Sequence, residues 1–200
     1  TRSVFHSILR PMIYKGHKLG SDSAEVVIES YLDYTCPFSR KGYERLVNDV
    51  VPHYEKMPGK VQFIFRHQVQ PWHPQSTLLH EAALAVEKVD PSKFFEFSGK
   101  LFQEQDSFND QNTANKSRLQ IYAELADIAE STGVDKDKFA ECLNLVHGGT
   151  GVTNDLKYYL KISRQNSIHV SPTVLINGLI DNEVSSSWTL EQWQEKIEKV

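Results

Sequence analysis

The sequence lacks the features that mark disulfide-stapled, membrane-spanning or repetitive proteins. Only two cysteines, Cys36 and Cys142, occur in 200 residues, which is too few for a disulfide framework. The longest apolar runs are short strand-like pieces such as residues 61–65, far below the roughly 18 residues that suggest a bilayer span. Repeats and low-complexity segments are also missing. We therefore expect a soluble globular protein with no membrane span.

Charge of one sign is not in excess either. The chain has 22 Lys and Arg against 26 Asp and Glu, so the balance gives no reason to expect nucleic acid or an anionic membrane as a partner. Its eight histidines do not follow the spacing of a known metal motif, and we predict no metal site. The chain opens at Thr1 without a methionine, which leaves open whether a targeting segment was removed. The compartment and the oligomeric state are not assigned.

The amino-terminal third predicts a strand, a helix and a second strand. Residues 12–20 are expected to form a short edge element, and residues 26–32 are rich in the β-branched and aromatic side chains of a strand. Because proline suits a first helical turn, a helix is expected to begin near Cys36 and to end at Pro52. Residues 61–66 give the second strand. Two strands joined through a helix are typical of parallel pairing.

The middle of the chain changes to the spacing of amphipathic helices. Apolar residues recur at intervals of three and four over residues 76–147, which predicts several packed helices. The polar stretch 105–116 is interpreted as a loop between two of them, and the glycine-rich residues 148–151 as a joint that closes the block. An all-helical insertion over about residues 75–150 follows from this pattern.

The carboxyl-terminal quarter returns to alternating elements. A helix is predicted over about residues 154–165, and residues 172–176 have the composition of a strand. Asn177-Gly178 is a signal for a tight hairpin turn. Thr189 with Gln192 three residues later forms a capping-box signal for a last helix. No linker separates independent domains, so residues 1–200 are expected to form one domain.

The tetrapeptide Cys36-Pro37-Phe38-Ser39 carries the most chemistry. At a strand-to-helix turn, the first backbone N–H groups and the positive end of the helix dipole converge on Cys36 and stabilise a thiolate. A buried, inert cysteine is the alternative. Ser39 lies three residues on, where it can bond locally to backbone, but its hydroxyl cannot form a disulfide.

The element order, together with several motifs, resembles the thioredoxin fold and is similar to the DsbA-like family over roughly residues 24–198. The motifs are Leu32-Asp33-Tyr34-Thr35-Cys36-Pro37, Phe65-Arg66-His67, His73-Pro74, Phe94-Phe95-Glu96-Phe97 with Leu101-Phe102, Leu125-Ala126 through Gly133-Val134 to Phe139, and Val170-Ser171-Pro172-Thr173. The resemblance implies an α/β fold, a central mixed sheet flanked by helices, with the helical insertion between its βαβ and αββα halves.

The resemblance also implies roles for individual residues. Cys36 matches the attacking cysteine, and Ser39 stands where family members carry a resolving cysteine, so Ser39 would at most donate a hydrogen bond to the thiolate. Pro172 resembles the family's cis-proline. Family members often carry a buried acid six residues before the first cysteine, and that position is Ser30 here. The residues expected to bind substrate are Pro37, Phe38, Ser171, Pro172 and Thr173.

Other residues near the expected site leave alternatives open. Trp72, Phe38 and Tyr34 could line an apolar groove or serve as ordinary packing. Cys142 is interpreted as core filler, with a remote resolving thiol as the alternative. The histidines at positions 67, 73 and 80 are expected in loops or at a helix start rather than as ligands.

These observations predict a thiol–disulfide oxidoreductase with a single active-site cysteine. No cofactor is expected to stay bound, but an external thiol such as glutathione would complete the turnover, because Ser39 cannot resolve a mixed disulfide. The partner would be a peptide or small molecule that contains a thiol or disulfide. A glutathione-dependent transferase or isomerase is one alternative, and a degenerate fold that binds peptides without turnover is the other.

Overall fold

A five-stranded mixed sheet forms the centre of the computed structural model, which describes residues 16–200. Its strands, in the order β1-β3-β2-β4-β5, are β1 (His17–Gly20), β3 (Val61–His67), β2 (Val26–Leu32), β4 (Thr173–Ile176) and β5 (Leu179–Ile180). β2 and β3 pair in parallel, as the sequence predicts, and the other neighbours are antiparallel. Of the edge element expected at residues 12–20, only residues 16–20 lie within the described part of the chain.

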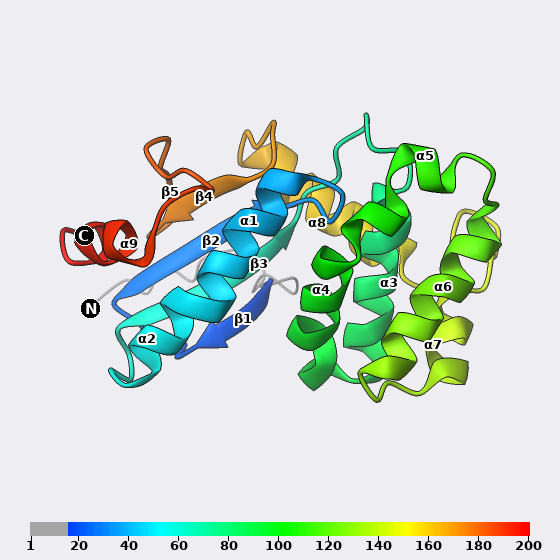
Figure 1. Ribbon diagram of the computed structural model, residues 1–200, viewed down its shortest axis with the longest axis horizontal. Helices are drawn as coiled ribbons and strands as arrows, with labels where there is room; N and C mark the ends of the chain where they lie inside the picture. The colour runs from blue at the N-terminus through cyan, green and yellow to red at the C-terminus, as the bar shows by residue number, and fades with distance from the viewer. Residues whose placement is uncertain (1–15) are drawn as a thin grey trace, which may run out of the picture.

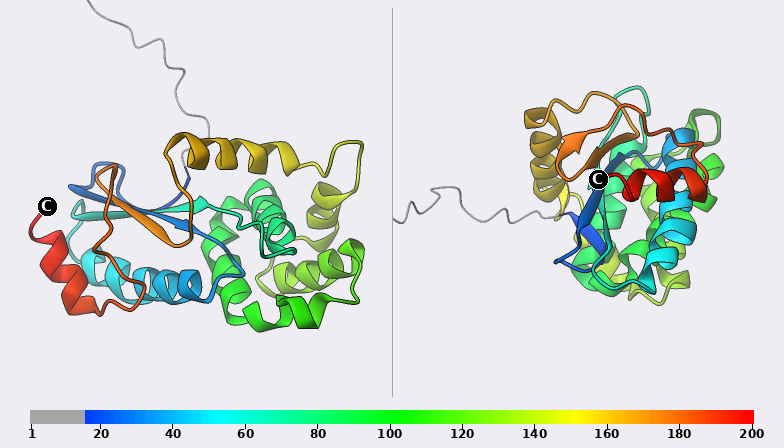
Figure 2. Two further views of the ribbon diagram at one scale, coloured as in Figure 1. Left: turned by 90° about the horizontal axis from the view of Figure 1, so that it is seen from above. Right: turned by 90° about the vertical axis from the view of Figure 1, so that its left-hand side faces the viewer.

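Helices cover both faces of the sheet (Figures 1 and 2). One face carries α1 (Pro37–Arg45), the π-helical segment η1 (Leu46–Val50), α2 (Val51–Glu55) and α9 (Leu190–Ile197), and the other carries α8 (Thr153–Gln165). Buried side chains such as Leu32, Phe63 and Ile197 fill the space between these layers. The fold is therefore the thioredoxin-like arrangement that the sequence predicts.

The helix after Cys36 runs past Pro52, where the sequence predicts its end. The Val51 N–H bonds to the Leu46 carbonyl five residues back, and this π turn joins α1 to α2. An α-helical register would press the proline ring against the carbonyl four residues before it, and the wider turn relieves that conflict. Pro52 thus lies in the first turn of α2, where its missing N–H is not needed.

The helical region between β3 and α8 packs as a separate layer beyond the end of the sheet (Figure 1). Its α-helices are α3 (Ser76–Val89), α4 (Phe94–Gln103), α5 (Asp110–Thr113), α6 (Arg118–Ser131) and α7 (Lys136–Leu143). The loop expected at residues 105–116 instead contains a 3-10 turn, η3 (Gln105–Phe108), and the short α5. Asn109 caps α5 by accepting a hydrogen bond from the Asn112 N–H, which explains why polar residues are helical here.

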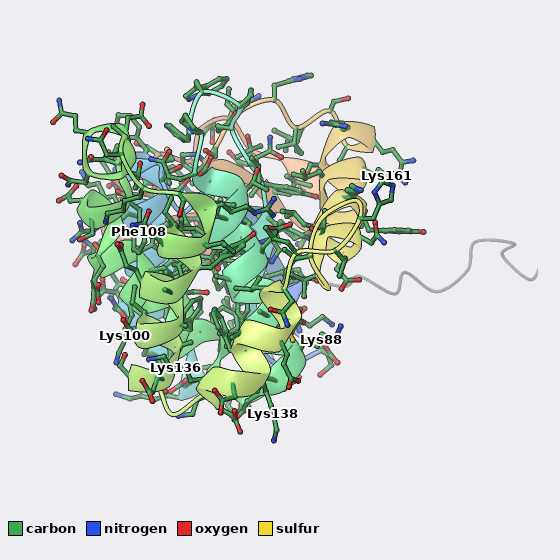
Figure 3. All side chains as sticks on the ribbon, turned by 90° about the vertical axis from the view of Figure 1, so that its right-hand side faces the viewer. Lys88, Lys100, Phe108, Lys136, Lys138 and Lys161 are labelled. Carbon is green, nitrogen blue, oxygen red and sulfur yellow. The ribbon has the colours of Figure 1, made fainter. Side chains whose placement is uncertain are left out.

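A buried carboxylate ties this layer to α8. Glu81 on α3 has no exposed surface, and it accepts hydrogen bonds from Arg118, Tyr122 and Thr153. Lysines such as Lys100 and Lys136 lie on the outer side of this helical layer (Figure 3). Lys100 binds the Ser131 carbonyl, while Lys136 binds two carboxylates on α6.

The carboxyl-terminal elements form as the local sequence predicts. Asn177 and Gly178 both have positive φ, 50° and 82°, and they make the tight turn between β4 and β5. Thr189 and Gln192 form the predicted capping box at the start of α9. β4 begins at Thr173 rather than at Pro172 because proline has no N–H for the ladder.

Candidate active site

The turn between β2 and α1 places Cys36 at the amino end of a helix. The Cys36 N–H donates to the Asp33 carbonyl at 3.1 Å, and Cys36 is the N-cap residue of α1, with Pro37 at its first position. Neither the Cys36 side chain nor another side chain caps the helix. The first turn of α1 therefore has no side-chain cap, and the positive end of the helix dipole lies beside Cys36.

The Cys36 thiol lies against the loop that precedes β4. Its Sγ is 3.4 Å from the Ser171 carbonyl oxygen, and the Ser171–Pro172 peptide bond is cis. Thr173 Oγ1 donates to the Val170 carbonyl at 2.7 Å and closes this loop on itself. Cys36 is only 5 % exposed, whereas Phe38, two residues after it, and Val170, next to Ser171 in the chain, are 63 % and 54 % exposed. The thiol is thus nearly covered, while both segments that meet at it carry an exposed apolar side chain.

Ser39 is buried, and its hydroxyl is used locally. Its Oγ accepts a hydrogen bond from the Asp33 N–H at 3.2 Å, which ties the first turn of α1 back to the end of β2. Ser39 thus makes the local hydrogen bond to backbone that the sequence analysis allowed for it. Pro37 and Phe38, by contrast, are exposed on the outside of the turn.

Asp33 organises the turn, a role that the sequence reasoning missed. It is fully buried, and one oxygen accepts bonds from the Thr35 N–H, the Thr35 hydroxyl and Ser76 at 2.6–2.8 Å. The other oxygen accepts from the Gln70 N–H at 2.7 Å and contacts His73 Nδ1 at 3.2 Å. A carboxylate directly after an apolar strand was the available signal, because it must be compensated when buried.

The bonds to Asp33 keep it ionised. Burial raises the pKa of this carboxyl, but the nearby His80 and the hydrogen bonds from Thr35 and Gln70 outweigh burial and hold the pKa below its ordinary value. Asp33 is therefore a fixed anion that joins three segments: the active-site turn, the β3–α3 loop and the start of α3.

An open hollow adjoins this turn on the side of the helical region. It has a volume of about 440 Å³, and its lining is entirely polar: Thr35, His73, Gln75, Asn109, Asp110 and Gln111. His73 is partly exposed there, with its ring beside that of Trp72 at a centroid distance of 6.1 Å. The hollow begins one residue from Cys36.

Comparison with known proteins identifies the family of this chain. The thioredoxin family model matches residues 14–199. The chain belongs to the thioredoxin family.

Relatives of this thioredoxin-family chain confirm its resemblance to DsbA-like proteins. Disulfide bond formation protein D of Bacillus subtilis is 28 % identical over 197 residues, which cover 95 % of this chain and 79 % of that protein. The crystal structure of a candidate protein-disulfide isomerase from Pseudomonas syringae matches with a TM-score of 0.77 at 24 % identity, over 93 % of this chain and 99 % of that one. Oxidised BdbD from Bacillus subtilis matches with a TM-score of 0.66 at 23 % identity, over 94 % of both chains.

Three buried histidines form a hydrogen-bonded chain beneath the site of this thioredoxin-family protein. His17 Nε2 lies 2.8 Å from His67 Nε2, and His67 Nδ1 lies 2.7 Å from His80 Nδ1. The surface end of the chain is Glu87, whose carboxylate lies 3.1 Å from His17 Nδ1. Sequence reasoning expected positions 67 and 80 in loops or at a helix start, but they lie at the end of β3 and inside α3.

The Glu87 end fixes how protons are placed along the three rings. A carboxylate only accepts, so His17 Nδ1 carries its hydrogen, and a neutral His17 must then accept from His67 at Nε2. By the same rule, His67 Nδ1 accepts from His80 Nδ1–H. His80 Nε2 is left with a lone pair and without a protein partner in the described residues. Each ring can satisfy this pattern only while it is neutral.

The interior keeps these rings neutral. Burial lowers the pKa of His17, with Glu87 only partly opposing it, and burial lowers the pKa of His67 well below its ordinary value. Burial also lowers the pKa of His80 to about 4, against a raising effect of Asp33. The chain of rings is therefore uncharged at neutral pH.

The burial of Tyr34 and of Ser30 bears on two further expectations, an apolar groove lined by Tyr34 and an acid before the active-site turn. Tyr34 does not line a groove: it is fully buried and its hydroxyl bonds to Ser98 at 2.7 Å, because the residue points into the core from the inner side of the turn. Ser30 is buried on β2, and its neighbour Glu29 instead pairs with Arg66 at 2.7 Å. Trp72 is 59 % exposed in the β3–α3 loop.

The two cysteines are not joined. Both are free, and Cys142 lies on α7, which Figure 1 places at the far side of the helical region from α1. Burial raises the pKa of the Cys142 thiol, which keeps it protonated.

Over residues 16–200, no group of three or more His, Cys, Asp and Glu side chains is arranged to hold a metal ion. None of the helices in that range is both long and apolar enough to cross a bilayer.

Proposed function

We propose that this thioredoxin-family chain is a thiol–disulfide oxidoreductase that uses one active-site cysteine, Cys36, and needs an external thiol to finish each turnover. The observation that carries the proposal is the position of Cys36 Sγ, at the amino end of α1 and 3.4 Å from the Ser171 carbonyl. The names of the relatives from Bacillus subtilis and Pseudomonas syringae, which refer to disulfide bond formation and isomerisation, support the same class of reaction.

The first step is attack by the Cys36 thiolate on a substrate disulfide. A bond forms between Cys36 Sγ and one substrate sulfur, the substrate S–S bond breaks, and the other sulfur leaves as a thiolate. A sulfur at a helix amino terminus can act both as nucleophile and as leaving group, because the helix dipole stabilises the negative charge that the sulfur carries in each role. Cys36 is thus suited both to start the exchange and to end it.

The second step needs a thiol from outside. In a two-cysteine site, the second cysteine would attack Cys36 Sγ and release the substrate, but Ser39 has only a hydroxyl, already bonded to the Asp33 N–H. An incoming thiolate must therefore attack the substrate sulfur of the mixed disulfide. It forms a new disulfide with that sulfur and frees Cys36 as a thiolate. Glutathione is the small thiol that we propose for this step.

The loop before β4 is the proposed docking place for the substrate. The Ser171 carbonyl lies 3.4 Å from the Cys36 sulfur, and Pro172 and Thr173 follow Ser171 in the loop. Phe38 and Val170 are exposed apolar side chains on the two segments that meet there. A partly apolar segment next to a disulfide can cover both side chains while its backbone lies along the loop. The proposed partners are thiol- or disulfide-containing peptides and small thiols.

Turnover of a glutathionylated peptide tests the proposed function. With the full chain and reduced glutathione, we expect release of the peptide thiol at a rate proportional to enzyme concentration. Without reduced glutathione, we expect release of at most one peptide thiol per protein. Multiple turnovers without any external thiol would contradict the single-cysteine cycle, and a rate independent of enzyme concentration would contradict the activity itself.

Restoring a second thiol at position 39 is expected to remove the need for an external thiol in the release step. Ser39→Cys places a sulfur three residues after Cys36 on the same helical turn, where intramolecular attack has a high effective concentration. We expect the Cys36 mixed disulfide to be released roughly 100-fold faster in this variant, with formation of a disulfide between Cys36 and the introduced thiol. Stopped reactions followed by intact-mass spectrometry measure both species.

Ser39→Ala is the matched control for this substitution. It removes the same hydroxyl and the same bond to the Asp33 N–H, but it supplies no thiol. We expect it to form the mixed disulfide as the natural chain does and to stay dependent on an external thiol. If Ser39→Ala released the adduct as fast as Ser39→Cys, loss of the hydroxyl rather than gain of a thiol would explain the change.

A further inference from the structure

The outer side of α8 is cationic, although the chain as a whole has a net charge of −4. The exposed residues of this helix include no acid; they are Asn154, Lys157, Tyr158, Lys161, Arg164 and Gln165. Because an α-helix turns by about 100° per residue, its three basic residues fall on one stripe, and Asp155, the only acid of α8, lies on a different side. The overall charge balance therefore conceals a local row of cations.

The cations of this stripe are not neutralised within the described part of the chain. Most lysines and arginines of residues 16–200 pair with a carboxylate, as Lys60 does with Glu25. In the same range, no carboxylate pairs with Lys157, Lys161 or Arg164. Figure 3 shows Lys161 on the outer side of α8. The stripe is thus open to an anionic partner.

The tight turn between β4 and β5 places aliphatic side chains beside this helix. Leu179 is 76 % exposed and Ile180 is 43 % exposed, and residues 177–180 include no acid. The turn and α8 border the same open hollow of about 350 Å³, to which α8 contributes Ile162 and Asn166. One surface therefore combines a row of cations with projecting aliphatic side chains.

The amino-terminal part of the chain leads into the same surface. Gly16 is the first described residue, and a Cβ at this position would lie 3.1 Å from Nη1 of Arg66, which lines the hollow. The sequence of residues 1–15 has three basic residues, seven apolar or aromatic residues and no acid. Its composition thus matches that of the surface to which it leads.

We propose that this surface docks on an anionic lipid bilayer. It is called the α8 face here and consists of Lys157, Tyr158, Lys161, Arg164, Leu179 and Ile180. The three cations bind the anionic headgroups, while the two aliphatic side chains of the turn enter the boundary between headgroups and acyl chains. Tyr158 adds the aromatic ring that is favoured at such an interface. A bilayer surface offers both chemistries at once, whereas an acidic polypeptide would match only the cations.

Docking through the α8 face leaves the proposed active site open. α8 covers one face of the sheet, and α1, whose N-cap is Cys36, lies on the other face (Figure 2). The first turn of α1 therefore belongs to the layer on the far side of the sheet from the bilayer. No step of the thiol exchange depends on the docking, so the two proposals stand or fall separately.

Co-sedimentation of the full chain with lipid vesicles tests the cationic part of the proposal. We expect binding to vesicles of phosphatidylcholine and phosphatidylserine, roughly 10-fold weaker binding to phosphatidylcholine alone, and release by salt, which screens the headgroup charge. The triple variant Lys157→Gln/Lys161→Gln/Arg164→Gln should bind the anionic vesicles roughly 100-fold more weakly.

The matched control removes the same charge elsewhere. Lys41→Gln/Lys56→Gln/Lys138→Gln changes three exposed positions outside the α8 face, and we expect it to bind the anionic vesicles as the natural chain does. Equal weakening by both triple variants would overturn the proposal, because binding would then follow net charge alone. Equal binding by the natural chain and the α8 triple variant would overturn it as well.

The aliphatic part of the face separates a bilayer from an acidic protein partner. Leu179→Ser should weaken vesicle binding roughly 10-fold, whereas Leu145→Ser, at an exposed position in the helical region, should not. Binding to soluble polyglutamate as tight as to the anionic vesicles, with no effect of Leu179→Ser, would instead identify an acidic partner and overturn the proposal. Glutathione exchange at Cys36, measured on the same variants, should be unchanged, so a failure of docking would leave the proposed function intact.

Discussion

Replacing Cys36 by alanine is expected to reduce the peptide-release activity by roughly 10³-fold or more, to the uncatalysed background. The reason is that Cys36 supplies both the nucleophile and the leaving group, and Cys142 cannot substitute for it from α7. The rate of thiol release from a glutathionylated peptide, with reduced glutathione present, measures the loss.

Cys142→Ala is the matched control, since it removes the only other cysteine in the chain. We expect it to keep the activity of the natural chain, because Cys142 is free and lies on the far side of the helical region. Loss of activity in Cys142→Ala with Cys36 intact would revive a remote resolving thiol. Full activity in Cys36→Ala would favour a transferase in which Cys36 is accessory.

Acidification from pH 6.5 to 4 is expected to cost the protein much of its stability. The pKa values of His17, His67 and His80 are lowered by burial, so the unfolded chain binds more protons than the folded chain in this range. The free energy of unfolding is therefore highest above pH 6.5 and falls as the pH drops. For His80, a shift from 6.5 to about 4 corresponds to about 3 kcal/mol at pH 4.

Urea unfolding, followed by tryptophan fluorescence at a series of pH values, measures this dependence. His80→Asn keeps an N–H for His67 Nδ1 but cannot titrate, so we expect a shallower slope between pH 4 and 6.5. His169→Asn, at an exposed position, should keep the slope of the natural chain. The buried Asp33 does not confuse the result: its pKa is lowered, so its stabilising effect is lost only below its ordinary value of 3.8. An unchanged slope in His80→Asn would contradict a neutral, buried chain of rings.

The parts of the fold that local chemistry dictates could be predicted from the sequence. The strand at residues 26–32, the turn at Asn177-Gly178 and the capping box at Thr189 depend on neighbours a few residues away, and all three form as expected. Pro52 failed as a helix end because the π turn before it relieves the conflict with the proline ring and lets the helix continue, and the local sequence pattern does not indicate such a turn.

The centre of the site was less visible in the sequence because it depends on long-range contacts. Cys36 and Ser171 are 135 positions apart, and only the resemblance to a family suggested that they would meet. Asp33 gains its partners from residues 70, 73 and 76, so its role appears only once β3 and α3 are in place. The same holds for His17, His67 and His80, which come from three different elements.

The central claim, that Cys36 begins an exchange which an external thiol must finish, is tested most directly by intact-mass spectrometry of the natural chain. After incubation with oxidised glutathione, we expect one glutathione on each chain, located at Cys36 by peptide mapping and stable when the excess is removed. Addition of reduced glutathione should then restore the original mass. A chain that stays unmodified, or that carries the adduct on Cys142 instead, would contradict the account.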